Sequence, residues 1–230
     1  MKKYFLPIVA CLLFVLSLNA KALVINGCVI EAYAQCAGAN LNGASLSNAD
    51  FYGSNLSNAT LVGADLFDAN LQSADLRYTG MMDADLTNAH FYLANLSWAN
   101  LSNANLSGGY LVDANLTNAV IANANLTSAN LQNANLANTR LTNANFSYAN
   151  LKNANLSNTL EFHDAGWHSA NFTGATYNQF TIFPTSDECW NCDFDPVAEG
   201  MIFVSEVPLP AGIYFFLSGL VGLGLIRGKN

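Results

Sequence analysis

The sequence predicts a β-solenoid, in which the chain winds into stacked coils around one apolar core. Every fifth residue from Leu41 to Leu156 is apolar, and 19 of these 24 positions hold Leu. The residue two places earlier is Ala in 20 of the 24 units, and the residue between the two is mostly Asn or Asp. The unit is therefore Ala, Asn or Asp, and Leu, followed by two variable residues.

A period of five residues excludes a straight helix or strand as the repeating structure. On an α-helix five residues advance by about 500°, so the Leu side chains would scatter around the helix. On a straight strand an odd step changes face and would place every second Leu in water. A chain that turns at each unit can point every Leu and Ala at a central axis, with coils about 4.8 Å apart.

The N-terminal segment, residues 1–22, is typical of a secretory signal peptide. Two lysines precede an apolar run, and Ala-Lys-Ala at residues 20–22 forms a small-x-small cleavage site. We expect signal peptidase to cleave there. Residues 23–38 follow as a short non-repetitive lead, which we expect to cap the open end of the solenoid.

The units Ala64-Asp65-Leu66 and Ala134-Asn135-Leu136 resemble those of the pentapeptide-repeat family. The resemblance covers about half of the chain. It implies a right-handed quadrilateral parallel β-helix with four units per coil, and hence about six coils over roughly 29 Å.

After Leu156 the repeat slips by one residue and becomes looser. Its apolar positions are then aromatic: Phe162, Trp167, Phe172 and Tyr177. Bulky rings suit the closing end of a narrow Leu column, so we expect a seventh coil and place the solenoid at residues 39–178.

Residues 179–206 form an acidic segment that contains Cys189 and Cys192. An exported chain favours disulfides, and the solenoid separates this pair from Cys28 and Cys36, so local pairing of 28 with 36 and of 189 with 192 is favoured. A redox centre and a four-Cys zinc site are the alternatives. The first lacks a surrounding βαβ pattern, and the second would require the tail to fold back along the solenoid.

The tail, residues 207–230, combines a short Pro motif, an apolar helix and a basic end. The motif and the first basic residue are Val207, Pro208, Leu209, Pro210, Ala211 and Arg227. A membrane anchor is one interpretation. The order also resembles the PEP-CTERM sorting signal of Gram-negative bacteria. That resemblance implies transient insertion into the inner membrane, cleavage by an exosortase-type protease, and delivery to the cell surface or the extracellular polysaccharide matrix.

Processing at both ends would make the protein strongly acidic. It would remove five of the eight basic residues and none of the 16 acidic ones, which leaves a net charge of about −13. We therefore expect the protein to repel nucleic acid and anionic membrane surfaces.

Four units per coil would stack residues that are 20 apart. Asp65 and Asp85 would then lie one above the other, with Asp83 around the same corner. Carboxylates this close repel unless a cation bridges them, so the three are weak candidates for a calcium site, with a solvated surface as the alternative.

Tyr78 and Trp98 would stack by the same rule, at an outward position that otherwise holds Asn. An exposed aromatic pair among amides can stack against sugar rings, which makes the pair a candidate polysaccharide contact. Ordinary surface variation is the alternative.

Three classes of function remain. The first, which the export signals favour, is a non-enzymatic structural or interaction protein, with glycan or calcium binding as a variant. The second is a DNA mimic that protects topoisomerases, which the resemblance to the pentapeptide-repeat family implies for some of its members. The position between Ala and Leu holds 13 Asn but only four Asp, so its charges imitate the phosphate spacing of DNA poorly. The third is an enzyme built on Cys189 and Cys192. No grouping of catalytic residues supports it, and we assign no catalytic residue and no cofactor.

Overall fold

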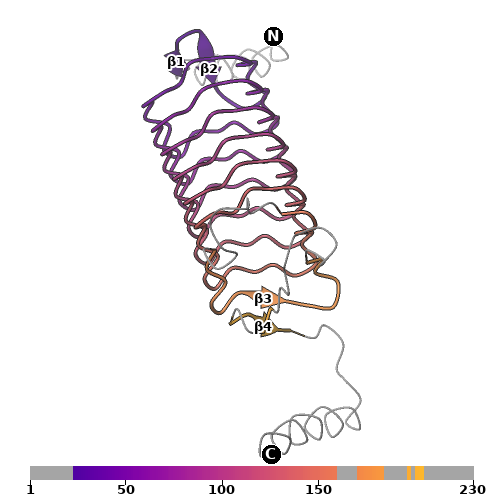
Figure 1. Cartoon of the computed structure of the whole chain (residues 1–230). Helices are drawn as coiled ribbons and strands as arrows, with labels where there is room; N and C mark the ends of the chain where they lie inside the picture. The colour runs from indigo at the N-terminus through magenta and orange to yellow at the C-terminus, as the bar shows by residue number, and fades with distance from the viewer. Residues whose placement is uncertain (1–22, 160–169, 184–195, 198–199, 205–230) are drawn as a thin grey trace, which may run out of the picture.

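The computed structural model describes residues 23–159, 170–183, 196–197 and 200–204, which form a rod of stacked coils (Figure 1). The predicted signal peptide, residues 1–22, and the predicted apolar tail, residues 207–230, lie outside the described residues. The two flanking helices predicted there are therefore not part of the described structure. Within the described ranges there is no helix, and hence none that could span a membrane.

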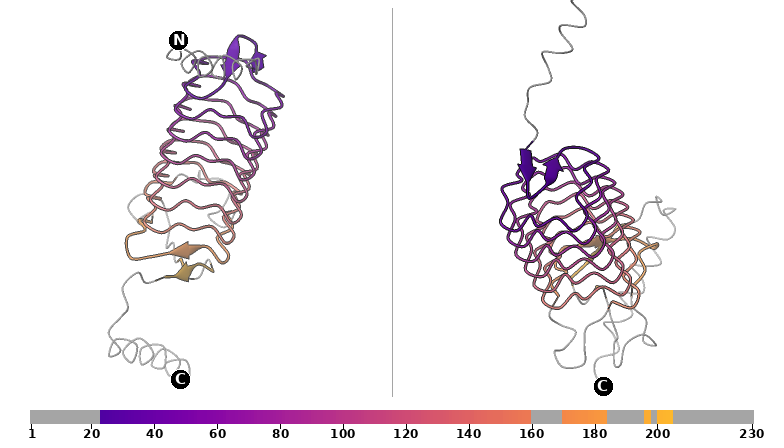
Figure 2. Two further views of the ribbon diagram at one scale, coloured as in Figure 1. Left: turned by 180° about the vertical axis from the view of Figure 1, so that it is seen from behind. Right: turned by 90° about the horizontal axis from the view of Figure 1, so that it is seen from above.

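Four units form each coil, as the quadrilateral prediction requires. The residue between Ala and Leu pairs in parallel with the residue 20 positions later, from Gln35 with Asn55 to Asn135 with Asn155. Backbone hydrogen bonds join the coils: Leu41 N donates to Thr60 O at 2.7 Å, and Thr60 N donates to Ala39 O at 2.9 Å. Figure 2 shows the stack from behind and from above.

The core is the column of Leu and Ala that the repeat predicts. All 24 apolar centre positions from Leu41 to Leu156 are buried, with exposed fractions between 0% and 4%. The Ala positions line the remaining interior, and the polar substitutes are satisfied there. Thr79 Oγ1, for example, donates a 2.7 Å hydrogen bond to Leu76 O, which removes the cost of an unpaired buried hydroxyl.

Each corner of the coil is a tight turn that places one residue in the left-handed region. In the first full unit, Ala44 N donates to Leu41 O at 3.1 Å, and Gly43 has a φ of 63°. A positive φ at the third turn residue is the pattern of a type II turn, which favours Gly and Asn. The second variable residue of each unit therefore sits at the point of the corner.

The Asn or Asp between Ala and Leu closes the following corner. The side-chain oxygen of Asn115 accepts hydrogen bonds from Thr117 N at 3.1 Å and from Thr117 Oγ1 at 2.6 Å. The same contact recurs along the rod, for example from Ser147 N to Asn145 Oδ1 at 3.0 Å. The repeat prefers Asn and Asp at this position because their short side chains place an oxygen where it accepts from the backbone N–H two residues later.

A hairpin covers the N-terminal end of the rod. β1 (Leu23–Ile25) pairs antiparallel with β2 (Cys28–Ile30) through a turn whose two central residues, Asn26 and Gly27, both have positive φ. An Asn-Gly pair of this kind is typical of a type I′ hairpin. The hairpin lies in the first half of the lead, residues 23–38.

The solenoid itself begins one unit earlier than residue 39. Ala34 and Cys36 are buried in the positions that Ala and Leu take in later units, and Gln35 between them pairs with Asn55. The five-residue pattern did not identify this first unit because Cys36 stands where later units have Leu. It behaves here as a small apolar residue.

The C-terminal end keeps the predicted one-residue slip of the repeat but stacks on a different part of the preceding coil. That slip would place Phe172 over Leu151, but Phe172 stacks on Phe146, with ring centroids 5.1 Å apart and planes inclined by 9°. Asn171 accordingly pairs with Asn145, 26 positions earlier. The predicted one-residue shift of the register is present, but the offset between coils also grows by one whole unit of five residues. Phe162 and Trp167 lie outside the described residues.

Coil stacking also continues past residue 178, where the sequence placed the end of the solenoid. β3 (Thr176–Tyr177) pairs in parallel with β4 (Ile202–Phe203), and Ile182 pairs with Asn155. Residues of the acidic segment 179–206 therefore form part of the last coils. Figure 1 shows β3 and β4 at the end of the rod opposite the hairpin.

Candidate functional site

Two faces of the rod carry the features that matter for function. We call them the His90 face and the Asn95 face, after the residues that each presents in one coil. They meet at the Leu93 corner, and the far edge of the Asn95 face is the Trp98 corner. Each face or corner continues along the rod as a column of residues 20 apart.

Large apolar residues occupy corner points that the turn geometry gives to Gly, Asn or Asp. Tyr78, Leu93 and Trp98 have φ values of 60°, 58° and 64°. A bulky residue in the left-handed region is strained, by about 1–3 kcal/mol, and such strain clusters at functional sites. Neither the backbone nor the core therefore explains why these three side chains are present.

Two other Tyr residues with positive φ have a local packing role. A Cβ built on Gly53 would lie 2.8 Å from the Tyr33 ring, and one built on Gly174 would lie 2.6 Å from the Tyr148 ring. Each Tyr therefore covers a glycine corner in the next coil. Tyr78 and Trp98 cover no glycine, which separates them from Tyr33 and Tyr148.

Tyr78 and Trp98 stack on each other along the Trp98 corner, as the 20-residue spacing predicts. Their ring centroids are 6.2 Å apart and their planes are inclined by 14°. Both side chains are more than half exposed, at 56% and 54%. The pair therefore presents two stacked, half-exposed aromatic rings to solvent.

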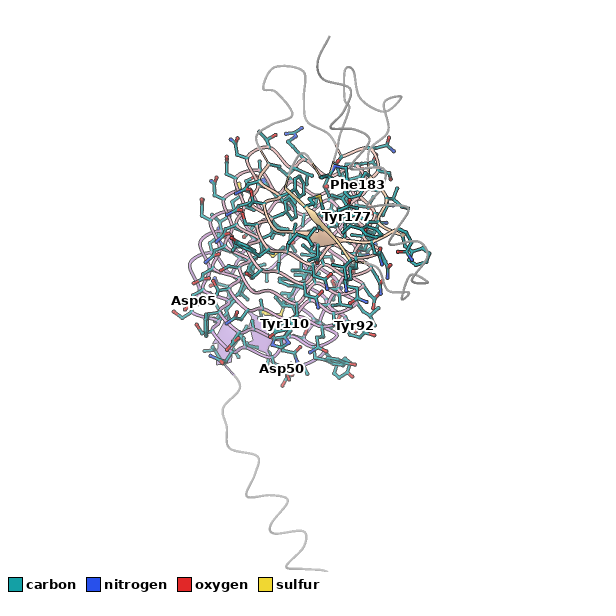
Figure 3. The ribbon with its side chains drawn as sticks, turned by 90° about the horizontal axis from the view of Figure 1, so that it is seen from below. Asp50, Asp65, Tyr92, Tyr110, Tyr177 and Phe183 are labelled. Atoms are coloured by element: carbon teal, nitrogen blue, oxygen red, sulfur yellow. A yellow bond between two sulfur atoms is a disulfide. The ribbon has the colours of Figure 1, made fainter. Side chains whose placement is uncertain are left out.

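A second stacked pair lies on the His90 face. The rings of His90 and Tyr110 are 4.7 Å apart with planes inclined by 21°, and Tyr92 follows at the edge of the same face. Tyr92 and Tyr110 lie on the side of the rod that also carries Asp50 (Figure 3). The 20-residue spacing that stacks Tyr78 on Trp98 also pairs His90 with Tyr110.

These side chains form one apolar belt around two faces of the rod. We define the apolar belt as Tyr78, His90, Tyr92, Leu93, Trp98 and Tyr110. Its five members other than His90 are exposed large hydrophobic residues. The belt is confined to successive coils in the middle of the rod, between columns that are otherwise rich in Asn, Ser and Thr.

Polar groups that can donate hydrogen bonds accompany the aromatic rings. Among the described residues, none accepts a hydrogen bond from the indole N–H of Trp98, and none is hydrogen-bonded to the hydroxyl groups of Tyr78, Tyr92 and Tyr110. Asn95 and Asn115 form the floor of the Asn95 face between the two corners, with Asn115 Nδ2 donating to Asn95 Oδ1 at 3.4 Å. The belt thus combines flat apolar surfaces with free donors and a polar floor.

One ion pair adjoins the belt. Arg77 donates from Nε to Asp75 Oδ1 at 2.8 Å and from Nη2 to Asp75 Oδ2 at 2.7 Å. The hydrogen bond from the Arg77 side chain lowers the pKa of Asp75, and the same contact raises the pKa of Arg77. Both oxygens of Asp75 are therefore engaged within the protein.

The three candidate calcium ligands do not converge. Asp65 and Asp85 pair across coils as predicted, but each carboxylate is held by its own surroundings. Ser47 Oγ donates to Asp65 Oδ2 at 2.6 Å, Thr87 Oγ1 donates to Asp85 Oδ1 at 2.6 Å, and Asn103 Nδ2 donates to Asp83 Oδ1 at 3.0 Å. No three His, Cys, Asp or Glu side chains of the described chain gather as metal ligands. Each of the three carboxylates accepts a local hydrogen bond, whereas the hypothesis had a cation bridging them.

The repeat unit and its geometry also identify the family. Pentapeptide repeats, in eight copies, match residues 33–66, 64–103, 94–132 and 119–160, which together exceed half of the chain. This chain belongs to the pentapeptide-repeat family. The match begins at residue 33, in agreement with the early start of the solenoid at Ala34.

Solved structures of pentapeptide-repeat proteins are similar to this chain. Rfr23 from the cyanobacterium Cyanothece 51142 is 35% identical over 43% of this chain and 63% of its own, with a TM-score of 0.39. HetL from Nostoc sp. strain PCC 7120, which is involved in heterocyst differentiation regulation, is 27% identical over 60% of this chain and 68% of its own, with a TM-score of 0.35.

A third similar structure is QnrB1, a plasmid-mediated fluoroquinolone resistance protein. It is 18% identical over 80% of this chain and 94% of its own, with a TM-score of 0.48. The chain described here spans about 63% of the length of Rfr23. No curated protein matches its sequence.

The predicted local pairing of the N-terminal cysteines is present in this pentapeptide-repeat protein. A disulfide joins Cys28 of β2 to Cys36 in the first coil, with their Cα atoms 5.0 Å apart. It fastens the capping hairpin to the core column. Cys189 and Cys192, like the sorting motif at residues 207–211 and Arg227, lie outside the described residues.

Proposed function

We propose that this pentapeptide-repeat protein is an exported, non-enzymatic interaction protein that binds extracellular polysaccharide through Tyr78 and Trp98. The observation that carries the proposal is the exposed stack of these two nearly parallel rings at corner points that disfavour bulky residues. The C–H faces of sugar rings pack on flat aromatic surfaces, and sugar hydroxyls pair with free amide, indole and phenol groups. The Trp98 corner and the Asn95 face offer both.

Export is the second part of the proposal. It rests on the signal-peptide pattern of residues 1–22 and on the resemblance of residues 207–230 to a PEP-CTERM signal. Signal peptidase and an exosortase-type protease are the processing partners that these segments imply. The end point is the cell surface or the polysaccharide matrix of a Gram-negative bacterium.

DNA mimicry is the alternative function, but the rod surface does not favour it. The outward columns contain ladders of neutral amides, for example Asn143 Nδ2 to Asn123 Oδ1 at 3.0 Å and Asn123 Nδ2 to Asn103 Oδ1 at 3.2 Å. Imitation of DNA requires regularly spaced negative charge. We therefore expect no binding to topoisomerases.

A binding experiment tests the glycan proposal directly. Purified protein is incubated with immobilised polysaccharides from the extracellular matrix of the host bacterium, and the retained fraction is measured for wild type, Trp98→Asn and Tyr148→Asn. We expect retention of wild type and Tyr148→Asn and loss of Trp98→Asn. Equal retention of all three proteins, or of none, would refute the proposal.

Cell fractionation with mass spectrometry of both termini tests the export proposal. We expect extracellular protein that begins near Leu23 and lacks the tail. Recovery outside the cell of a chain that still ends at Asn230 would rule out the sorting step.

A further inference from the structure

The apolar belt lies in the acidic half of the rod. From Glu31 to Asp113 the chain holds eight acidic residues and one basic residue, Arg77, which is paired with Asp75. Residues 114–159 hold no acidic residue and two basic ones, Arg140 and Lys152. The apolar belt and the negative charge of the described rod therefore lie in the same half.

Asp113 brings a carboxylate into the belt itself. It occupies the Leu93 corner one coil after Leu93, since Leu93 N donates to Val112 O at 3.2 Å. It also follows Tyr110 in its own coil, so it lies between the two aromatic stacks. One carboxylate oxygen accepts from Asn133 Nδ2 at 2.8 Å, and no described residue donates to the other.

Exposed aromatic rings beside a free carboxylate suit a cation attached to an apolar or amphipathic frame. A protonated amine gains energy over the face of Trp or Tyr and gains more from a nearby carboxylate. A neutral sugar gains nothing from the charge of the carboxylate, and a uronic acid is repelled by the acidic half of the rod. The charge complementarity therefore selects among the polysaccharides that the aromatic rings could accept.

We propose that the apolar belt with Asp113 is a binding site for amino-sugar polysaccharide, in which protonated glucosamine units lie across the rod from the Tyr78–Trp98 stack to the His90–Tyr110 stack. This inference rests on the proposed glycan-binding function and names its ligand class. Sugar rings pack on the two aromatic stacks, and the Asp113 carboxylate pairs with an ammonium group between them.

Calorimetric titration of the purified protein with three hexasaccharides tests this assignment. The probes are a glucosamine hexamer with free amines, the fully N-acetylated hexamer, and an alginate hexamer, at a mildly acidic pH that keeps the amines protonated. We expect the free-amine hexamer to bind on the order of tenfold more tightly than the N-acetylated one, and alginate to show no binding. Added salt should reduce this preference.

Two variants separate the ring contacts from the charge contact. Trp98→Asn should abolish binding of both glucosamine hexamers, whereas Tyr148→Asn, a matched change outside the belt, should leave it unaltered. Asp113→Asn keeps an acceptor for Asn133 and should remove most of the preference for the free amine, without weakening the N-acetylated hexamer.

The outcomes distinguish the two proposals. Equal affinity for both glucosamine hexamers, or an amine preference that survives in Asp113→Asn, would overturn the amino-sugar assignment and leave glycan binding intact. Absence of any Trp98-dependent sugar binding would overturn the glycan-binding function itself.

Discussion

Trp98 lies against Tyr78 in the preceding coil, with ring planes inclined by 14°, and both residues hold a positive φ. The stack therefore exists at a backbone cost. In the same column Asn58, Asn118 and Asn138 adopt a similar φ with a side chain that tolerates it. Trp98→Asn therefore has two separate effects, relief of the backbone strain and loss of the aromatic surface, which unfolding and glycan binding measure independently.

Trp98→Asn should not destabilise the rod. Asn is favoured in the left-handed region, so we expect the free energy of unfolding to stay level or rise by up to about 1 kcal/mol. Urea denaturation followed by circular dichroism measures it. The reverse change, Asn138→Trp, places a Trp in the same column without an aromatic neighbour and should lower stability by about 1 kcal/mol. A clear loss of stability in Trp98→Asn would mean that the stack is structural.

Gly53→Ala should destabilise the rod more than Gly63→Ala. The two glycines have φ values of 62° and 63°, but a Cβ on Gly53 would lie 2.8 Å from the Tyr33 ring, whereas one on Gly63 meets nothing within 4 Å. We expect about 1 kcal/mol of strain in both variants and about 1 kcal/mol more for Gly53→Ala. Equilibrium unfolding gives both values.

The origin of the difference can be checked in a second background. In Tyr33→Asn the ring is absent, so Gly53→Ala and Gly63→Ala should become equally costly. A difference that persisted there would exclude the ring contact as its cause.

Leu106→Ala should cost about 2–5 kcal/mol, because it leaves a cavity in the middle of the Leu column. Leu106 is fully buried, and in a solenoid each coil is stabilised by its neighbours. We expect hydrogen exchange to accelerate most in the coils next to residue 106. Ser107→Ala, a change at the neighbouring outward position, serves as the control and should alter stability by less than about 0.5 kcal/mol.

The five-residue repeat predicted the middle of the rod well because each unit carries its own complete signal. Leu and Ala define the inward side, whereas the 20-residue coil was implied by the resemblance to the pentapeptide-repeat family. The ends were harder to predict. Cys36 hid the first unit because it replaces Leu, and the offset from Phe146 to Phe172 depends on the non-periodic chain between them.

The candidate site was found in part for the same reason. Tyr78 and Trp98 stood out as aromatic residues in an Asn column, and their stacking follows from the spacing. The strain at Leu93 and the free oxygen of Asp113 depend on backbone angles and on the direction of the Asn133 amide. Neither quantity can be obtained from residue types alone.

Reduction of the Cys28–Cys36 disulfide should loosen the N-terminal end of the rod. The bond closes a short loop, with a sequence separation of 8, for which chain entropy accounts for about 2.5 kcal/mol at most. Cys28→Ala removes the bond and leaves Cys36 in the core. We expect faster hydrogen exchange in residues 23–40 and unchanged exchange near residue 106. Uniform acceleration along the rod would show that the hairpin stabilises the whole solenoid.

Acidification should weaken the rod through carboxylates that accept hydrogen bonds. The Ser47 hydroxyl and the Phe67 N–H lower the pKa of Asp65, and the Arg77 side chain lowers that of Asp75. A carboxyl group whose folded pKa lies below its unfolded value, about 3.9, contributes its stability fully above that value. The contribution disappears as the pH falls through the folded pKa. We therefore expect stability to be level from neutral pH to about pH 5 and to decline below about pH 4.

Asp65→Asn tests this assignment, because it keeps an acceptor oxygen and removes the titrating group. Thermal melting at pH values between about 5 and 2 should show a smaller decline for this variant than for wild type. Asp68→Asn is the matched control, since no described residue donates to the Asp68 carboxylate. Its decline should equal that of wild type. If Asp65→Asn also followed the wild-type curve, the hydrogen bond from Ser47 would contribute nothing to acid sensitivity, and the decline would have to come from carboxylates elsewhere in the chain.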